Sequence, residues 1–259
     1  MPKDTRKRSL IQRVKLFQSW VKEAPQSDTL EVADTVATLD DSGIGEDGGG
    51  LVTWTDAVHG KSWKAPGLAN NPGRGNMLNG HEVLSFDGAT QLLKLSEMLI
   101  ANLPAFSLSV LVNGNPSQGG NQFNAYNEDS SAGGFKGVGL YHVSTSDNDH
   151  IAAQFDMWDD AGANLGAQSG DVANDQVNGQ WNLLQVVQTS KSERTVYIDG
   201  ANGVSDTTVV GNFTLNESFI GSGFNGLVAF LHIKDGAYGA DERGAVKSHV
   251  NSRYGLAFA

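Results

Sequence analysis

A run of carboxylates around one tryptophan, Asp156-Met-Trp-Asp-Asp160, is the first place where this chain could do chemistry. A retaining glycoside hydrolase needs two carboxyl groups about 5 Å apart. The run contains no glutamate and lies at the end of a predicted strand, where aspartate is common. We therefore predict that the chain is not an enzyme. Trp158 and Asp156 are the candidate glycan-binding residues, because an indole ring can stack on a sugar.

Calcium is the one cofactor that the sequence raises, since this ion needs several oxygen ligands in a small volume. Two sets of side chains could supply them: Asp156, Asp159 and Asp160 with Asp147-Asn148-Asp149, or Asp40, Asp41, Glu46 and Asp47. Neither set has the spacing of an EF-hand loop, and carboxylates in glycine-rich loops are also ordinary turn residues. We expect that no cofactor is required, with calcium at Asp156, Asp159 and Asp160 as the alternative.

The sequence contains none of the other common catalytic or cofactor patterns. Its six histidines form no H-x-x-x-H or H-x-H pair. It has no G-x-S-x-G nucleophile turn, no phosphate-binding Walker loop and no dinucleotide-binding glycine motif. Trp54, Trp63 and Trp181 lie in strand or turn contexts, so packing in the core is the prediction for them.

The elements that must position these residues are clearest in the last third of the chain. Leu183 to Val187 is an apolar run, which predicts a strand buried on both faces. Thr195 to Asp199 alternates polar and apolar residues, as a half-buried strand does, and Asp199-Gly200 then favours a hairpin turn. Gly226 to Ile233 predicts another strand. Asp241-Glu242 should open a helix, because acidic residues favour a helix N-terminus.

Further strands are predicted near residues 83–87, 91–95, 106–112, 137–143, 151–157, 207–210 and 217–221. The polar segments 113–134 and 159–180 are predicted to be long loops. Many short strands, joined by turns in a chain with 32 glycines, predict an all-β fold. We expect an antiparallel two-sheet jelly-roll sandwich with these residues buried: Phe86, Leu108, Val110, Leu184, Val186, Ile198, Phe230 and Ile233.

Three stretches of the chain resemble the concanavalin A-like lectin/glucanase superfamily in its laminin G-like form. They are Leu51 to Asp56 with Asn79 to Gly88 and Leu92-Leu93, then Phe106 to Val112, then the tail with Gly221, Phe224 to Gly226, Asp241-Glu242 and Tyr254-Gly255-Leu256. The likeness covers roughly residues 32–257. It implies a concanavalin A-like sandwich, and it raises calcium and carbohydrate binding as expectations. Such modules occur in phage virion and bacterial surface proteins, so the fold alone does not select a function.

The beginning of the chain differs from the rest in charge and pattern. The net charge is −11, but residues 1–23 hold seven Lys/Arg and two Asp/Glu. Leu10, Val14, Phe17 and Val21 recur at helical spacing, which predicts an amphipathic helix that Pro25 ends. We predict a helical docking arm (1–24), a linker (25–50) and the sandwich (51–259). The partner-binding candidates are Leu10, Val14, Phe17, Trp20 and Val21 with Arg8 and Arg13. A solvated helix without a partner, or a helix that covers its own sandwich, is the alternative.

Two functions fit these features. The first is a non-enzymatic virion structural protein, a phage capsid decoration or tail component made in the host cytoplasm. It would be attached by the arm to a major capsid protein, a tail protein or its own copies. The second is a glycan-binding adhesion module on a bacterial cell surface. The chain has no cysteine, no visible secretory signal and no apolar run of about 18 residues. We therefore expect no membrane partner, and the acidic body argues against nucleic acid.

Overall fold

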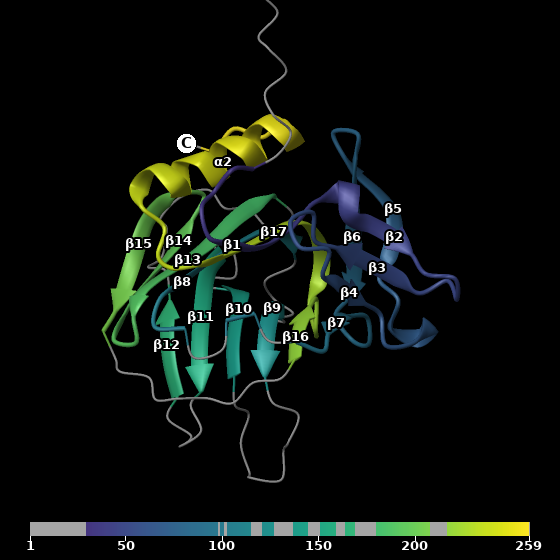
Figure 1. The fold of residues 1–259 in the computed structure, drawn as a ribbon, viewed down its shortest axis with the longest axis horizontal. Coiled ribbons are helices and arrows are strands. Elements are labelled where there is room, and N and C mark those ends of the chain that lie inside the picture. The colour runs from purple at the N-terminus through teal and green to yellow at the C-terminus, as the bar shows by residue number, and fades with distance from the viewer. Residues whose placement is uncertain are drawn as a thin grey trace, which may run out of the picture. The chain divides into compact units, whose positions relative to one another are not determined.

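The computed structural model describes residues 30–97, 99–100, 103–114, 121–126, 137–144, 151–158, 164–168, 180–207 and 217–258 (Figure 1). The chain divides into two units, residues 1–31 and 32–259. The second unit contains the strands and the helix described below. The predicted docking arm lies outside the described residues, so its helix and its partner-binding residues stay predictions.

The first sheet of the sandwich has eight strands among the described residues, all of whose pairings are antiparallel. Seven of them follow the order β15 (Ala201–Asp206), β14 (Glu193–Ile198), β13 (Asn182–Ser190), β8 (Phe106–Gly114), β17 (Asn225–Asp235), β6 (His81–Asp87) and β5 (Gly73–Leu78). The eighth, β1 (Thr35–Leu39), pairs with the second half of β17. The long strand β17 therefore joins β8 on one side to β6 and β1 on the other.

The second sheet has nine strands in the same described part of the chain, and these are antiparallel as well. Their order is β12 (Asn164–Gln168), β11 (Ile151–Trp158), β10 (Gly137–Ser144), β9 (Asn121–Tyr126), β16 (Glu217–Ile220), β7 (Leu93–Leu95), β4 (Ser62–Lys64), β3 (Val52–Thr55) and β2 (Ile44–Glu46). Two 3-10 helices, η1 (Asp41–Gly43) and η2 (Leu68–Asn70), lie between these strands in the sequence. Together the sheets confirm the predicted all-β, two-sheet sandwich.

The core between the two sheets is built from alternate residues of their strands. All eight residues predicted to be buried are 0–3% exposed: Phe86, Leu108, Val110, Leu184, Val186, Ile198, Phe230 and Ile233. Trp54 and Trp63, which pair across β3 and β4, are fully buried, as the sequence predicts. Trp181 is only partly buried, because it lies just before β13 begins.

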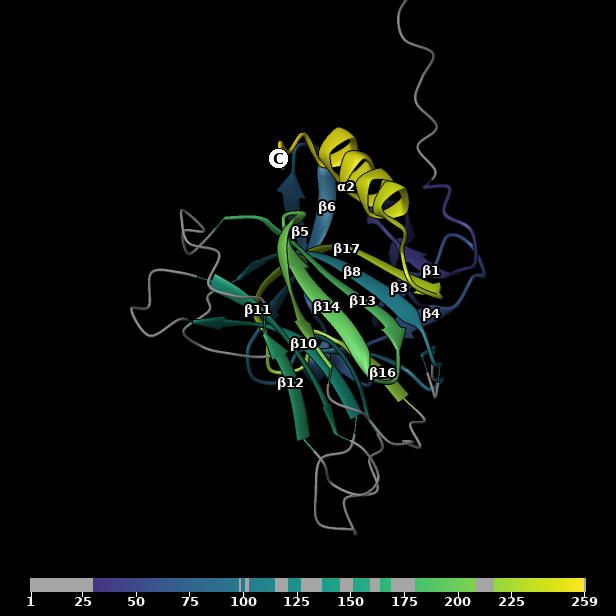
Figure 2. The ribbon, with the colours of Figure 1, turned by 90° about the vertical axis from the view of Figure 1, so that its left-hand side faces the viewer.

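The helix α2 (Ala240–Tyr254) forms a third layer over the eight-stranded sheet, as Figures 1 and 2 show. Its buried residues Val246, Val250 and Tyr254 face that sheet, and the Tyr254 hydroxyl donates a hydrogen bond to the Ala229 carbonyl of β17. This layer explains why β8 and β13 are buried on both faces. The predicted helix start is confirmed, since the Glu242 carboxylate accepts from the Gly239 backbone N–H, which closes the first turn.

Three boundary predictions are wrong. The predicted linker 25–50 contains β1 and β2, so the sandwich begins before residue 51. The predicted loops 113–134 and 159–180 contain β9, where Phe123 and Tyr126 stand among asparagine and glutamine residues, and β12, whose mostly small and polar residues carry little strand preference of their own. The strand predicted near 207–210 falls on residues 208–210, which lie outside the described part, so it stays a prediction, whereas β15 at Ala201–Asp206 was not predicted. In each case the backbone bonds come from a partner strand that the local sequence does not reveal.

Candidate functional site

The predicted glycan-binding residues Asp156 and Trp158 lie on β11, which the structure describes through its backbone. This strand pairs with β10 on one side and β12 on the other. Asp156 lies opposite Gly139 of β10 and Gly166 of β12, and Trp158 lies opposite Gly137 of β10. Glycine in a strand interior weakens the strand, and it often marks a place where a ligand or another backbone approaches closely.

The register also shows on which face of the sheet these residues lie. Leu140 of β10 is fully buried in the core and pairs with Phe155 of β11. Residues of a strand alternate between its two faces, so Asp156 and Trp158 belong to the face away from the core. We call this surface, made of Gly137, Gly139, Asp156, Trp158 and Gly166, the β11 face. Glycine thus stands opposite Asp156 on both neighbouring strands and opposite Trp158 on β10, whereas Asn164 stands opposite Trp158 on β12.

Most of the calcium ligands that we predicted near β11 lie outside the described residues, so their arrangement is not part of the structure described. Asp159 and Asp160 lie outside the described part of the chain, as do residues 147–149. Calcium at Asp156, Asp159 and Asp160 therefore stays a prediction.

Half of the second predicted calcium set is tied to the end of α2. The guanidinium of Arg253 lies 2.7 Å from Asp41 and 3.5 Å from Asp40, and His81 Nδ1 lies 3.0 Å from Asp41. Partial burial opposes ionisation of Asp41, but the hydrogen bonds from His81 and Arg253 outweigh it and lower the pKa of this carboxyl. Basic side chains thus hold these two carboxylates, and they fasten the helix end to η1.

Glu46 and Asp47, the other two residues of the second predicted calcium set, also form ion pairs with basic side chains. Glu46 pairs with Arg74 at 3.2 Å, and Asp47 pairs with Lys64. The hydrogen bond from Lys64, followed by backbone hydrogen bonds from Leu51 and Gly49, lowers the pKa of Asp47 to about 2. Within the described ranges, no three His, Cys, Asp or Glu side chains lie close enough together to hold a metal ion.

A second candidate site lies between α2 and the eight-stranded sheet. It is a pocket of about 110 Å³ lined by Gln185, Gly200, Ala240, Arg243, Gly244 and Lys247. We call it the helix pocket. Its residues come from β13, from the turn between β14 and β15, and from the first turns of α2. The sequence predicted no binding role for any of them, and Gly200 was expected only as part of a hairpin turn.

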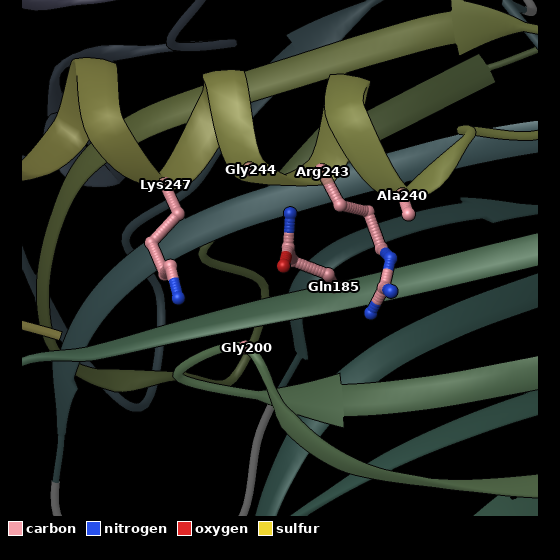
Figure 3. A pocket seen from close by; sticks show the side chains of 6 residues that line it. All are labelled: Gln185, Gly200, Ala240, Arg243, Gly244 and Lys247. Atoms are coloured by element: carbon pink, nitrogen blue, oxygen red, sulfur yellow. The ribbon is translucent and has the colours of Figure 1, made fainter. Parts of the chain in front are cut away.

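Two basic side chains of α2 flank the helix pocket. Arg243 and Lys247 extend from the helix on either side of Gln185, above the turn that contains Gly200 (Figure 3). The Arg243 guanidinium lies 4.0 Å from the centre of the Tyr197 ring, which fixes it by a cation–π contact. A Cβ atom at Gly200 would lie 3.0 Å from Cδ of Lys247, so the lysine crosses this turn closely.

The floor of the helix pocket is the fully buried amide of Gln185. Its Nε2 donates to Oγ of Ser109 at 3.2 Å, whereas its Oε1 has no hydrogen-bond partner among the described residues. A buried carbonyl without a partner costs about 1–3 kcal/mol, so such groups are rare without a reason. The sequence held a signal for this site, since Gln185 is the one polar residue within the apolar run Leu183 to Val187.

A buried histidine determines the direction of the hydrogen bonds behind Gln185. Burial, reinforced by the charges of His249 and Lys234, lowers the pKa of His232 to about 3, so its ring is neutral at pH 7. The Thr35 hydroxyl donates to the Val32 carbonyl at 2.6 Å and therefore accepts from Nε2 of His232 at 3.1 Å. Nδ1 of His232 is then the acceptor that remains for its other contact.

That contact fixes the rest of the chain of hydrogen bonds. The Tyr238 hydroxyl donates to Nδ1 of His232, and burial raises the pKa of this tyrosine, which keeps its proton. Ser109 Oγ donates to the Tyr238 oxygen at 3.3 Å and thus accepts from the Gln185 amide nitrogen. Along this chain of hydrogen bonds, once one group is known to donate, its neighbour must accept, and so each direction follows from the one before it. Consequently Gln185 directs its nitrogen inward and its carbonyl oxygen toward the helix pocket.

The chain was compared with known proteins. No protein-family model matches it, and no curated protein matches its sequence. Among solved structures it is similar to the binding domain of botulinum neurotoxin serotype G, with TM-score 0.60 and 9% identity, over 84% of this chain and 51% of that one. The serotype D ligand-binding domain in complex with N-acetylneuraminic acid matches with TM-score 0.60 and 9% identity, over 83% and 50%.

A sialidase is similar as well. The Trypanosoma rangeli sialidase in complex with sialic acid matches with TM-score 0.57 and 15% identity, over 95% of this chain and 38% of that one. The chain thus spans about half the length of the neurotoxin binding domains and less than two fifths of the sialidase. At such low identity these likenesses show a common β-sandwich fold alone. No helix of the described part is long and apolar enough to cross a membrane.

Proposed function

We propose that the chain is a glycan-binding module of the concanavalin A-like kind, in its laminin G-like form, and that the β11 face binds the glycan. The observation that carries this proposal is the position of Asp156 and Trp158 opposite Gly137, Gly139 and Gly166, on the face away from the core. A carboxylate accepts hydrogen bonds from adjacent sugar hydroxyls, and an indole stacks on the apolar side of a sugar ring. The flanking glycines leave room for the ring to approach the sheet.

The structural neighbours support this function over the virion role. The sandwich fold is common to this chain, a neurotoxin ligand-binding domain and a sialidase, two of which were solved with sialic acids. Attachment to a virion depends on residues 1–24, which lie outside the described residues. It stays a prediction, as do the absence of catalysis and the location at a bacterial surface or in a virion.

The proposal is tested with the whole chain on an array of immobilised glycans, followed by titration of each glycan that it retains. We expect Trp158→Ala to weaken binding by a factor between about two and about ten, since stacking on an aromatic ring contributes about 0.5–1.5 kcal/mol. Asp156→Asn keeps the shape of the side chain but removes its charge, and it should weaken binding as well.

Trp181→Ala is the matched control, because Trp181 is a partly buried tryptophan just before β13, in the other sheet. It should leave glycan affinity unchanged. The proposal is wrong if no glycan is retained, or if Trp158→Ala and Trp181→Ala bind every retained glycan equally well.

A further inference from the structure

We propose that the helix pocket is a second binding site, which takes a carboxylate group with a hydroxyl beside it. Such a hydroxycarboxylate is the end group of an acidic sugar, and it is also found in small hydroxy acids. The site lies on the outer side of the eight-stranded sheet, whereas the β11 face belongs to the nine-stranded sheet. It therefore does not depend on the glycan-binding proposal.

The carboxylate is inferred from the two basic side chains. Arg243 and Lys247 bring positive charge to one small pocket of a chain whose net charge is −11. No carboxylate of the described residues forms an ion pair with the Arg243 guanidinium. The guanidinium carbon lies 4.0 Å from the centre of the Tyr197 ring, and a cation–π contact of this kind uses none of the five N–H donors of arginine.

The hydroxyl is inferred from Gln185. Its carbonyl oxygen faces the pocket because Ser109 holds the amide nitrogen, and a carbonyl can only accept a hydrogen bond. An anion without a hydrogen-bond donor would leave the Gln185 carbonyl oxygen without a partner, and it would be repelled by the partial negative charge of that oxygen. An amine ligand would satisfy the carbonyl but would be repelled by Arg243 and Lys247. A ligand with an acidic group and an adjacent hydroxyl can pair with the Arg243 guanidinium and donate to the Gln185 carbonyl at the same time.

Gly244 supports a binding role for the same space. It lies inside α2, where glycine lowers helix stability relative to alanine. A Cβ atom built on it would meet nothing within 4 Å, so packing within the described residues does not require a glycine there. Its position on the pocket lining provides a reason, since a methyl group would narrow the space above Gln185. The volume of about 110 Å³ suits an end group rather than an oligosaccharide.

The test is a titration of the ¹⁵N-labelled whole chain at pH 7, followed by amide chemical shifts. The ligands are glucuronate and lactate, with glucose and acetate for comparison. We expect saturable shifts at Gly200, Gly244 and Lys247, with a dissociation constant on the order of 1 mM for a hydroxycarboxylate. Glucose lacks the acid and acetate lacks the hydroxyl, so each should bind at least tenfold more weakly. If lactate and glucuronate bind with equal affinity, the site recognises the hydroxycarboxylate group alone. If only glucuronate binds, the site recognises a sugar acid.

Two variants locate the binding. Lys247→Met should weaken it at least tenfold, and Gly244→Ala should do the same without lowering the thermal midpoint. Lys191→Met, in the turn between β13 and β14, is the matched control and should bind as the wild type does. The inference is overturned if neither hydroxycarboxylate gives saturable shifts, if acetate binds as tightly as both, or if Gly244→Ala and Lys247→Met keep wild-type affinity.

Discussion

Acidification from pH 7 to pH 5 should destabilise the fold through His232. The imidazole is fully buried, and burial, with the nearby charges of His249 and Lys234, lowers its pKa to about 3. In the unfolded chain a histidine takes up a proton below about pH 6.5. The folded protein does not follow until about pH 3, so stability is lost progressively as the pH falls between these two values. At pH 5 the loss from this residue amounts to about 2 kcal/mol.

The assay is urea unfolding of the wild type, His232→Gln and His59→Gln at pH 7, 6 and 5. Between pH 7 and pH 5 the wild type should lose about 2 kcal/mol more than His232→Gln does. His59→Gln is the control for the loss of an imidazole outside the core, since this side chain is 46% exposed. An identical pH dependence of the wild type and His232→Gln would refute the reasoning. The imidazole resonances of the wild type provide a second check, since protonation of His232 above pH 5 would contradict it even if the variant fails to fold.

Three substitutions test how the fold is held together. Gly221→Ala should cost about 3 kcal/mol of unfolding free energy, because the backbone φ is 78° and the new Cβ would overlap the Phe86 ring; a change below about 0.5 kcal/mol would contradict this. Arg253→Ala should cost roughly 3 kcal/mol at pH 7. That difference should shrink once Asp41 is protonated at low pH, since the folded state lowers its pKa. Gly244→Ala should raise the unfolding free energy by about 0.5–1 kcal/mol, and a loss would reveal a structural need for this glycine.

The strands that carry a strong local pattern could be predicted from the sequence. Leu183 to Val187 forms the middle of β13, and the alternation through Val196 and Ile198 forms β14, with both apolar residues fully buried. The turn between β14 and β15 was predictable from Asp199-Gly200, whose φ angles are 53° and 83°. Here the pattern and the turn residues are local, so neither depends on the rest of the chain.

The remaining elements depend on contacts between distant segments. β1 exists because Ala37 and Leu39 pair with the end of β17, almost two hundred residues later. β12 has a small and polar sequence, and its pairing with β11 supplies the backbone bonds that define it. The helix pocket combines Gln185 of one strand with Arg243 of the helix. Each residue alone is unremarkable in sequence, and the tertiary fold makes them one site.

The most direct test of the glycan-binding account is the footprint of a bound glycan on the protein. The ¹⁵N-labelled chain is titrated with the glycan that it retains most strongly, and the shifted amides are mapped onto the two sheets. The account predicts that the largest changes fall on β10, β11 and β12, at Gly139, Asp156 and Gly166, and that Trp158→Ala needs a higher glycan concentration to reach them. Shifts confined to the eight-stranded sheet or to α2, or no shift with any glycan, would contradict it.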